Sequence, residues 1–358
     1  MRNENMSNSC ESAVRISNQK DTVPYSPSMK NLKLTVFSAL TTLAMTLATT
    51  CVHAAGFQHG FASDPNGKPL KIGIWYPSQA TPKPMSMGPT TMSVAFNATI
   101  DGRALPLVVM SHGTGGSFLG HYDTAIALAD AGYVVAAVTH MGDNYADQSR
   151  SVFIMDRPKQ ISRVIDHMLS SWDGRATIDS ARIGMFGFSA GGFTTLVSVG
   201  GLADFSKVEP MCREHPKDFA CQLIAKTGPA GIEPPDSGLA QDHRIKAAVV
   251  AAPALGFTFS PDGLKNVKIP VQLWRAENDV ILPHPRYTEA VLRALPKEPD
   301  YHVALKAGHF DFLAPCSIAL ANIAPVICKS EPDFNREAFH QTFNITVVDF
   351  FGNNLKYN

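Results

Sequence analysis

Neither basic nor acidic residues are in excess in this chain of 358 residues, which has 31 of each. This balance excludes the basic surface with which proteins bind nucleic acid electrostatically. Charged residues make up only 17% of the chain and hydrophobic residues 45%, which excludes a disordered chain and supplies a large core. No apolar run reaches the roughly 18 residues of a membrane-spanning helix without a polar interruption. The sequence therefore predicts a globular protein without stable membrane insertion.

The first 54 residues have the features of a leader. Residues 1–28 are polar and irregular, and we interpret them as an extension that results from an upstream choice of start site. From Met29 the order is that of a signal peptide over residues 29–54: a short basic start, an apolar stretch at 34–47 and the small-residue pattern Val52-His53-Ala54. We predict cleavage after Ala54 and a periplasmic or secreted protein. A buried N-terminal helix is the alternative.

Cysteine is scarce, with six residues in the chain. Removal of the leader would leave Cys212, Cys221, Cys316 and Cys328, an even number that suits an oxidising compartment. Four cysteines allow more than one pairing. We predict the pairs that are close in sequence, Cys212 with Cys221 and Cys316 with Cys328. Four separate buried thiols are the alternative.

Strand-like and helix-like segments alternate from residue 70 onward. Short apolar runs predict strands at 70–76, 107–111, 133–139, 182–186, 245–251, 271–274 and 302–305. Helices are predicted at 122–131, 158–170, 191–199, 287–295 and 337–350. The alternation predicts an α/β domain over residues 55–358, with a mostly parallel central sheet flanked by helices. Residues 81–102, rich in proline, methionine and threonine, are predicted to be a connection without regular structure.

Residues 202–242 interrupt the alternation of strands and helices. The segment is polar and rich in proline, and it lies between a predicted helix and a predicted strand. We therefore predict a cap-like insertion over one end of the sheet. A functional lid and a decorated surface loop are both compatible with this composition.

The strongest motif is Gly187-Phe188-Ser189-Ala190-Gly191. This pattern places a serine on a sharp turn between a strand and a helix, where glycines are needed because neighbouring backbone comes close. The predicted strand 182–186 and helix 191–199 supply that context. Ser189 is therefore the candidate nucleophile, and a structural glycine-rich turn is the alternative.

Two further residues suit the roles of acid and base. Asp279 lies just past the predicted strand 271–274, where a carboxylate can orient a histidine, and Glu277 is its nearest competitor. His309 follows the strand 302–305 in a loop beside a glycine. The order Ser189, Asp279, His309 is that of the α/β-hydrolase arrangement. We predict that these three residues form a catalytic triad.

A glycine-rich loop, Ser111-His112-Gly113-Thr114-Gly115-Gly116, follows an early strand. Glycines there let backbone N–H groups point at a developing oxyanion, and the predicted donors are the N–H groups of Thr114 and Ala190. We interpret His112 and His140, which also end strands, as loop-shaping or substrate-side residues. Asp143 and Asn144 are interpreted as turn residues, and a role in shaping the pocket is the alternative.

These residues resemble those of the α/β-hydrolase superfamily. Within it, residues 56–350 are similar to bacterial dienelactone-hydrolase-like proteins and platelet-activating-factor acetylhydrolase homologues. The resemblance rests on Ile74-Trp75-Tyr76-Pro77, Ser111-His112-Gly113, Thr139-His140-Met141-Gly142-Asp143-Asn144, the motif at Ser189, and His309.

The chain departs from that resemblance at two positions. Dienelactone hydrolases use a cysteine nucleophile where this chain has Ser189. Mammalian acetylhydrolases take their acid from the loop after the preceding strand, which here reads Ala251-Ala252-Pro253-Ala254 and has no carboxylate. The acid predicted for this chain is therefore Asp279.

The chemistry predicted from these features is hydrolysis of a small-molecule carboxylic ester through a covalent acyl-enzyme. It needs no cofactor and no metal, and the sequence has no cysteine and histidine spacing typical of a metal site. A lipase-like enzyme for longer acyl chains is a close variant. An amidase or peptidase with the same triad is the alternative enzyme class, and a non-catalytic binding or scaffold protein with this fold is the alternative outside enzymes.

Overall fold

A computed structural model describes residues 54–64, 68–227 and 240–356. The chain divides into two units, residues 1–49 and 50–358, and every described residue lies in the second. The predicted leader and signal peptide, except Ala54, fall outside the described residues.

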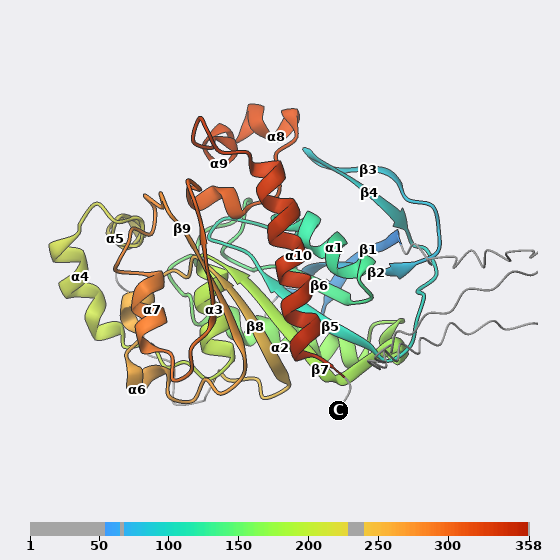
Figure 1. Cartoon of the computed structure of the whole chain (residues 1–358), viewed down its shortest axis with the longest axis horizontal. Coiled ribbons are helices and arrows are strands. Elements are labelled where there is room, and N and C mark those ends of the chain that lie inside the picture. The colour runs from blue at the N-terminus through green and yellow to red at the C-terminus, as the bar shows by residue number, and fades with distance from the viewer. Residues whose placement is uncertain (1–53, 65–67, 228–239, 357–358) are drawn as a thin grey trace, which may run out of the picture. The chain divides into compact units, whose positions relative to one another are not determined.

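Ten strands form one sheet within the described ranges, in the order β10-β9-β8-β7-β5-β6-β2-β1-β4-β3 (Figure 1). Their bounds are β1 (Ala54–Ala62), β2 (Leu70–Ser78), β3 (Lys83–Met87), β4 (Thr90–Phe96), β5 (Leu105–Ser111), β6 (Val134–Thr139), β7 (Ile178–Phe188), β8 (Ile245–Ala251), β9 (Val271–Ala276) and β10 (Asp300–Ala304). Neighbours from β6 through β5, β7, β8 and β9 to β10 are parallel, whereas β2 is antiparallel to β6 and to β1. The predicted mostly parallel sheet is confirmed.

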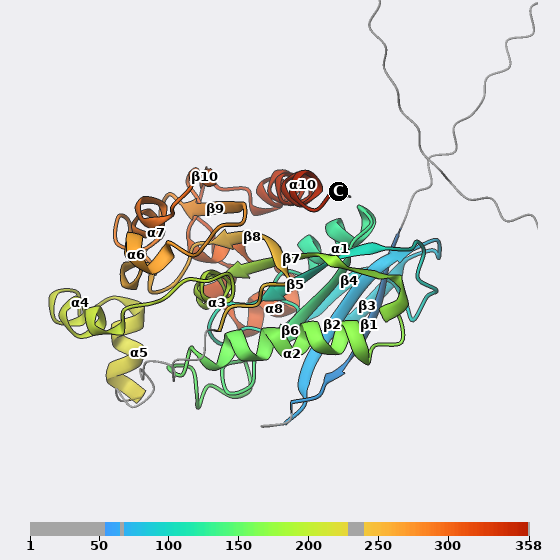
Figure 2. The same ribbon diagram turned by 90° about the horizontal axis from the view of Figure 1, so that it is seen from below.

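Helices cover both faces of this sheet (Figure 2). Helices α1 (Tyr122–Asp130) and α10 (Arg336–Asn354) lie on one face, and α2 (Asp156–Ser170) and α3 (Ala190–Ser198) lie on the other. Each face has its own buried cluster of apolar side chains. The apolar strand runs predicted from the sequence follow from this arrangement, because a strand covered on both faces buries successive residues; β5, for example, is buried throughout.

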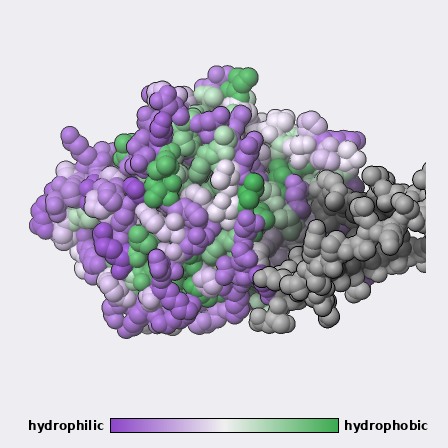
Figure 3. Space-filling view, in the orientation of Figure 1, coloured by the Kyte–Doolittle hydropathy of each residue, from purple (hydrophilic) through white to green (hydrophobic). Residues whose placement is uncertain are grey.

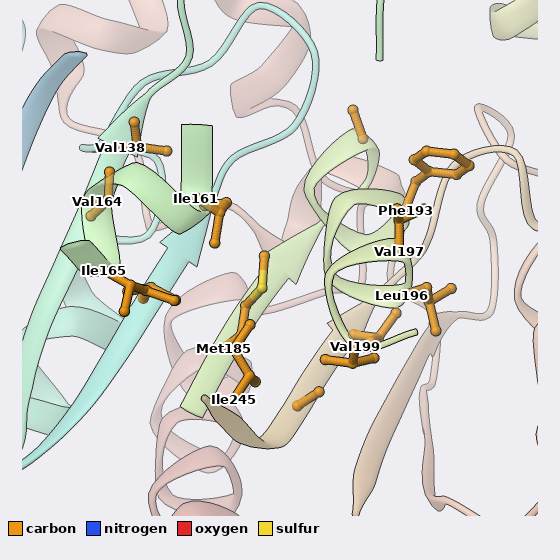
Figure 4. Packing of buried hydrophobic residues seen from close by; sticks show 14 of the residues in the cluster. Val138, Ile161, Val164, Ile165, Met185, Phe193, Leu196, Val197, Val199 and Ile245 are labelled. Atoms are coloured by element: carbon orange, nitrogen blue, oxygen red, sulfur yellow. The ribbon is translucent and has the colours of Figure 1, made fainter. Parts of the chain in front are cut away.

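Helix α2 shows how spacing selects the buried face. Ile161, Val164, Ile165 and Met168 are all buried, at the intervals that place side chains on one side of a helix. Figure 4 shows Ile161 and Ile165 on the side of the helix near Met185 of β7, and Val164 beside Val138 of β6. The sheet and α2 therefore bury one continuous apolar layer, on which α3 also rests.

The predicted irregular connection at residues 81–102 is wrong, because β3 and β4 form an antiparallel hairpin there. In β4 the side chains of Thr90, Met92 and Val94 are buried, and those of Thr91 and Ser93 are exposed. This alternation is that of a strand, but threonine on both faces hides it from a search for apolar residues. Strand β1, which pairs with β2 over its whole length, was not predicted either.

The two ends of the sheet differ in sequence but share one feature. At one end β3 begins with Lys83 and Pro84. At the other end the five-residue strand β10 begins with the exposed Asp300. Each outermost strand thus carries a charged residue or a proline at its start.

The insertion predicted at residues 202–242 contains η2 (Phe205–Lys207), α4 (Val208–Glu214) and α5 (Phe219–Thr227), whereas residues 228–239 lie outside the description. The structure joins Cys212 to Cys221, as predicted. Asp218 binds the Arg286 guanidinium at 3.1 Å and accepts a hydrogen bond from the Tyr287 hydroxyl at 3.0 Å. The insertion is therefore attached to the segment that follows β9.

The remaining short elements lie mainly in the C-terminal half. They are η1 (Arg175–Thr177), η4 (Gly256–Thr258), α6 (Pro261–Leu264), α7 (Thr288–Ala294), η5 (His309–Phe312), α8 (Ile318–Ile323) and α9 (Pro325–Cys328). Cys316 is joined to Cys328 around α8 and α9, the second predicted pair. Hydrophobic side chains of this region, including Ile318 and Val326, reach the surface (Figure 3). Among the described helices, none has the length and apolar character needed to cross a membrane.

Candidate active site

Ser189 lies at the turn between β7 and α3, as the motif predicts. Its backbone has φ +56° and ψ −117°, a conformation that residues other than glycine rarely adopt. Gly187 and Gly191 make the turn possible, because a Cβ atom at Gly187 would overlap the Gly191 carbonyl and one at Gly191 would overlap the Ser111 carbonyl. The Ser189 N–H donates to the Ala251 carbonyl at 2.9 Å, which fixes the strained turn against β8.

The structure brings Ser189, Asp279 and His309 into one hydrogen-bonded line. His309 Nε2 lies 3.0 Å from Ser189 Oγ, and His309 Nδ1 lies 2.7 Å from Asp279 Oδ2. All three residues are buried. They come from the ends of three different elements, since Ser189 follows β7, Asp279 follows β9 and His309 begins η5.

The hydrogen bonds of Asp279 determine where His309 carries its proton. A carboxylate oxygen only accepts, so Nδ1 of His309 must donate to Asp279, and Nε2 is left free to accept the Ser189 proton. The other carboxylate oxygen of Asp279 accepts the N–H groups of Ile281 at 3.0 Å and Leu282 at 2.7 Å. The arrangement has the geometry of a nucleophile, a base and an orienting acid.

Glu277, the competing acid, has a different environment. Its carboxylate accepts the Lys306 N–H at 2.8 Å in an exposed position. The structure therefore places Asp279, and not Glu277, beside His309.

The glycine-rich loop lies against the nucleophile. A Cβ atom at Gly113 would lie 3.2 Å from Ser189 Cβ, so the backbone at 113 and 114 passes directly beside the serine. Ala190 is the first residue of α3, and the first N–H groups of a helix have no partner within it. The two predicted oxyanion donors, the N–H groups of Thr114 and Ala190, thus belong to segments that flank Ser189.

A buried polar network beneath this loop was not predicted from the sequence. Arg157 of α2 and Asp143 are almost fully buried and form an ion pair at 2.7 Å. Arg157 also donates to the His112 carbonyl at 2.6 Å, and Asp143 accepts the Gly115 N–H at 2.9 Å. The interpretation of Asp143 as a simple turn residue is wrong, whereas Asn144 does accept N–H groups within the turn 144–147.

His112 and His140 belong to the same network and have loop-shaping contacts. His112 Nε2 accepts the His140 N–H at 3.0 Å, so its Nδ1 carries the proton and donates to the Gly113 carbonyl at 2.6 Å. His140 lies between Gln160 and the Ser111 hydroxyl, at 2.9 and 2.8 Å. Burial, with the nearby Arg157 charge, holds the pKa of both imidazoles well below the ordinary value, so both stay neutral.

A second network supports the segment that carries His309. Asp311 accepts the Gly308 N–H at 2.7 Å and the Arg336 Nε–H at 2.9 Å. His340 of α10 lies 2.9 Å from the Asp311 carbonyl and 2.6 Å from the Asp123 carboxylate. Helix α10 therefore fixes the position of η5, a role that the sequence pattern of residues 337–350 did not reveal.

Metal ligation has no candidate in the part of the chain that the structure describes. No group of three or more histidine, cysteine, aspartate or glutamate side chains lies there in an arrangement that could hold an ion.

Residues 83–160 match the family described as platelet-activating factor acetylhydrolase, isoform II. No curated protein matches the chain at a significant level. Among solved structures, a ferulic acid esterase from Streptomyces cinnamoneus is similar, with a TM-score of 0.57 and 19% identity over 86% of this chain and 91% of that one. At this identity the likeness shows the fold, which is the predicted α/β-hydrolase fold.

Proposed function

We propose that this protein is a serine hydrolase that cleaves small carboxylic esters through a covalent acyl-enzyme. The observation that carries the proposal is the hydrogen-bonded line from Asp279 through His309 to Ser189, which ends on a strained turn between a strand and a helix. A serine is a weak nucleophile by itself and becomes active when an adjacent oriented base takes its proton.

In the first half of the proposed reaction, Ser189 Oγ attacks the ester carbonyl carbon while His309 Nε2 takes the hydroxyl proton. Asp279 stabilises the imidazolium that forms and keeps its Nδ1–H directed at the carboxylate. The carbonyl oxygen becomes negatively charged, and the N–H groups of Thr114 and Ala190 would stabilise that charge. His309 then gives its proton to the alkoxide leaving group, which departs as the alcohol.

In the second half, water replaces the alcohol at the acyl-enzyme. His309 takes a proton from water as the water oxygen attacks the acyl carbon, and the same backbone N–H groups stabilise the second oxyanion. His309 then returns a proton to Ser189 Oγ, and the carboxylic acid is released. His309 passes on each proton that it accepts within the same half-reaction, so the proposed cycle balances without a cofactor.

The comparisons favour an ester over an amide as the substrate. The matched family is described as an acetylhydrolase, and the structurally similar protein is an esterase. An acetyl ester and a ferulic acid ester differ greatly in the acyl group, so an esterase for small esters is the shared proposal. The amidase and lipase-like alternatives differ from it in leaving group and in acyl length.

The place of action proposed is outside the cytoplasm, in the periplasm or the medium. The two disulfides, Cys212–Cys221 and Cys316–Cys328, support it because such bonds persist in oxidising compartments. The signal peptide predicted at residues 29–54 supports the same destination.

The test is hydrolysis of p-nitrophenyl esters from acetate to palmitate by the protein and by its Ser189→Ala variant, with a p-nitroanilide as the amide probe. We expect activity on short esters that the substitution abolishes without loss of the folded state. Hydrolysis that persists in the alanine variant, or a folded protein that cleaves the anilide and no ester, would contradict the proposal. An optimum at palmitate would support the lipase-like alternative.

A further inference from the structure

The peptide group between Gly113 and Thr114 carries one of the two proposed oxyanion donors, the Thr114 N–H. A peptide group is planar and trans, so its carbonyl and its N–H point in opposite directions. The orientation of the Gly113 carbonyl therefore determines the orientation of the Thr114 N–H. A rotation of this one peptide would present a carbonyl oxygen, and not a donor, to the developing oxyanion.

The Gly113 carbonyl is held by two donors from its own loop and by one from α2. His112 Nδ1 lies 2.6 Å from it, the Gly116 N–H 3.1 Å and the Arg157 guanidinium 3.3 Å. Rotation of this peptide changes ψ of Gly113 and φ of Thr114. Gly113 has no Cβ that would oppose the rotation on its side. These hydrogen bonds therefore add directly to the restraint that the Thr114 backbone supplies.

Arg157 is placed to hold several points of the loop at once. Its Nη1 donates to the His112 carbonyl at 2.6 Å, and its Nε and Nη2 bind Asp143 Oδ2 at 3.0 and 2.7 Å. The other oxygen of Asp143 accepts the Gly115 N–H at 2.9 Å. The ion pair thus contacts the loop on both sides of Thr114.

Stability does not explain why the protein keeps this ion pair. Removing both charges from water is costly, and apolar side chains of similar volume often replace a buried ion pair at no loss of stability. The planar fork of an arginine, by contrast, can bind a carboxylate and two carbonyls in fixed directions. The contacts suit a role in orientation.

We propose that Arg157, Asp143 and His112 are positioning residues that fix the Gly113–Thr114 peptide with its N–H directed at the oxyanion site beside Ser189. The inference rests on the proposed serine-hydrolase function. It implies that losing this network removes one oxyanion donor while Ser189, His309 and Asp279 remain in place.

The test variant combines Arg157→Met with Asp143→Asn. This pair leaves no lone buried charge, and the asparagine oxygen can still accept the Gly115 N–H. The matched control is Arg150→Met with Asp156→Asn, which removes an ion pair of the same type at 2.7 Å between the same loop and the same helix, but an exposed one. If the buried double variant does not fold, Arg157→Lys takes its place, because lysine keeps the charge but lacks the planar fork that directs separate N–H groups at the two carbonyls and the carboxylate.

Steady-state kinetics give the first readout. For the buried variant we expect kcat on p-nitrophenyl acetate to fall about 100-fold with KM within about threefold, because the lost interaction forms only in the transition state. The inhibition constant of a trifluoromethyl ketone, which forms a tetrahedral adduct with serine, should rise by a similar factor. The exposed variant should match the unaltered protein in all three quantities. A buried variant with unchanged kcat would overturn the inference.

Crystal structures of both double variants give a second readout that does not depend on turnover. We expect the Gly113–Thr114 peptide of the buried variant to be rotated or present in more than one orientation, with the three triad side chains in place. An unrotated peptide would overturn the inference even if kcat falls. If the unaltered protein shows no Ser189-dependent ester hydrolysis, the proposed function fails separately, and the peptide orientation alone then decides the positioning role.

Discussion

Replacing Asp279 by asparagine tests the proposed base most directly, because it changes one proton position and little volume. Asp279 has one oxygen on His309 Nδ1 at 2.7 Å and the other on the N–H groups of Ile281 and Leu282. An asparagine has only one oxygen, so it must satisfy either the two backbone donors or the histidine. Leaving a buried donor unsatisfied costs about 1–3 kcal/mol, so satisfying two donors is preferred by about that amount.

The preferred orientation points the asparagine NH₂ group at His309 Nδ1. Nδ1 must then accept a hydrogen bond, so the imidazole proton moves to Nε2, which faces Ser189 Oγ at 3.0 Å. A protonated Nε2 cannot take the serine proton. The loss measured for this change in an unrelated serine protease is about 10⁴-fold in kcat, which corresponds to about 5 kcal/mol of activation free energy.

The assay is kcat for p-nitrophenyl acetate at pH 7, together with thermal unfolding of the same sample. We expect kcat to fall by about 10⁴-fold with the melting temperature close to that of the unaltered protein. Asn278→Ala is a suitable control, since the Asn278 side chain is exposed. In the described structure its side-chain NH₂ group donates one hydrogen bond, to the Lys306 carbonyl at 3.4 Å. A folded Asp279→Asn protein that retains more than about a tenth of its kcat would refute the tautomer argument and return Glu277 to consideration.

Three further outcomes follow from separate features. Gly191→Ala should lower the free energy of unfolding, measured with denaturant, by about 1–3 kcal/mol or more, because the new Cβ would overlap the Ser111 carbonyl. Gly60→Ala is the control, since a Cβ there meets open space and should leave the free energy of unfolding nearly unchanged. Equal effects of the two substitutions would refute the packing argument. Replacing both Cys212 and Cys221 by serine should lower the free energy of unfolding by about 2–3 kcal/mol, because the disulfide closes a loop with a sequence separation of 9. An unchanged free energy of unfolding would show that the disulfide adds nothing to stability. Burial, opposed in part by Asp123, lowers the pKa of His121 from 6.5 to about 4, so between these pH values the unfolded chain binds more protons and stability falls as the pH falls. His121→Phe should therefore make the free energy of unfolding fall less on acidification from pH 6.5 to 4, by up to about 3 kcal/mol. An unchanged dependence of the unfolding free energy on pH would contradict that account.

The strands and helices of the parallel half could be predicted because each is specified locally. The apolar run at 107–111 and the helical spacing of Ile161, Val164 and Ile165 both become buried surfaces in the structure. The hairpin at 83–96 could not be found in the same way, since polar threonine occupies both faces of β4. Strand β1 begins at Ala54, the last residue of the predicted signal peptide, so the start of the strand coincides with the predicted cleavage pattern.

The line of Ser189, Asp279 and His309 could be anticipated because each residue follows a recognisable strand and the order along the chain is informative. The supporting networks could not. Arg157 meets the His112 carbonyl across 45 positions of sequence, and His340 meets Asp123 across 217. No local pattern marks such pairs, because their partners are chosen by the packing of α2 and α10 on the sheet. The one signal that the sequence offers is the position of Arg157, four residues before Ile161 and in line with the apolar face of the predicted helix.

The ends of the sheet bear on how the protein behaves when it is concentrated. A sheet whose outermost strand is long, flat and apolar invites a strand from another molecule, which is a common route to aggregation. Here one outermost strand opens with Lys83 and Pro84, and the other is a short strand that opens with Asp300. A proline has no N–H to offer to an incoming strand, and a charge would have to lose its water. We expect these features to keep the sheet from extending into a second copy by strand pairing.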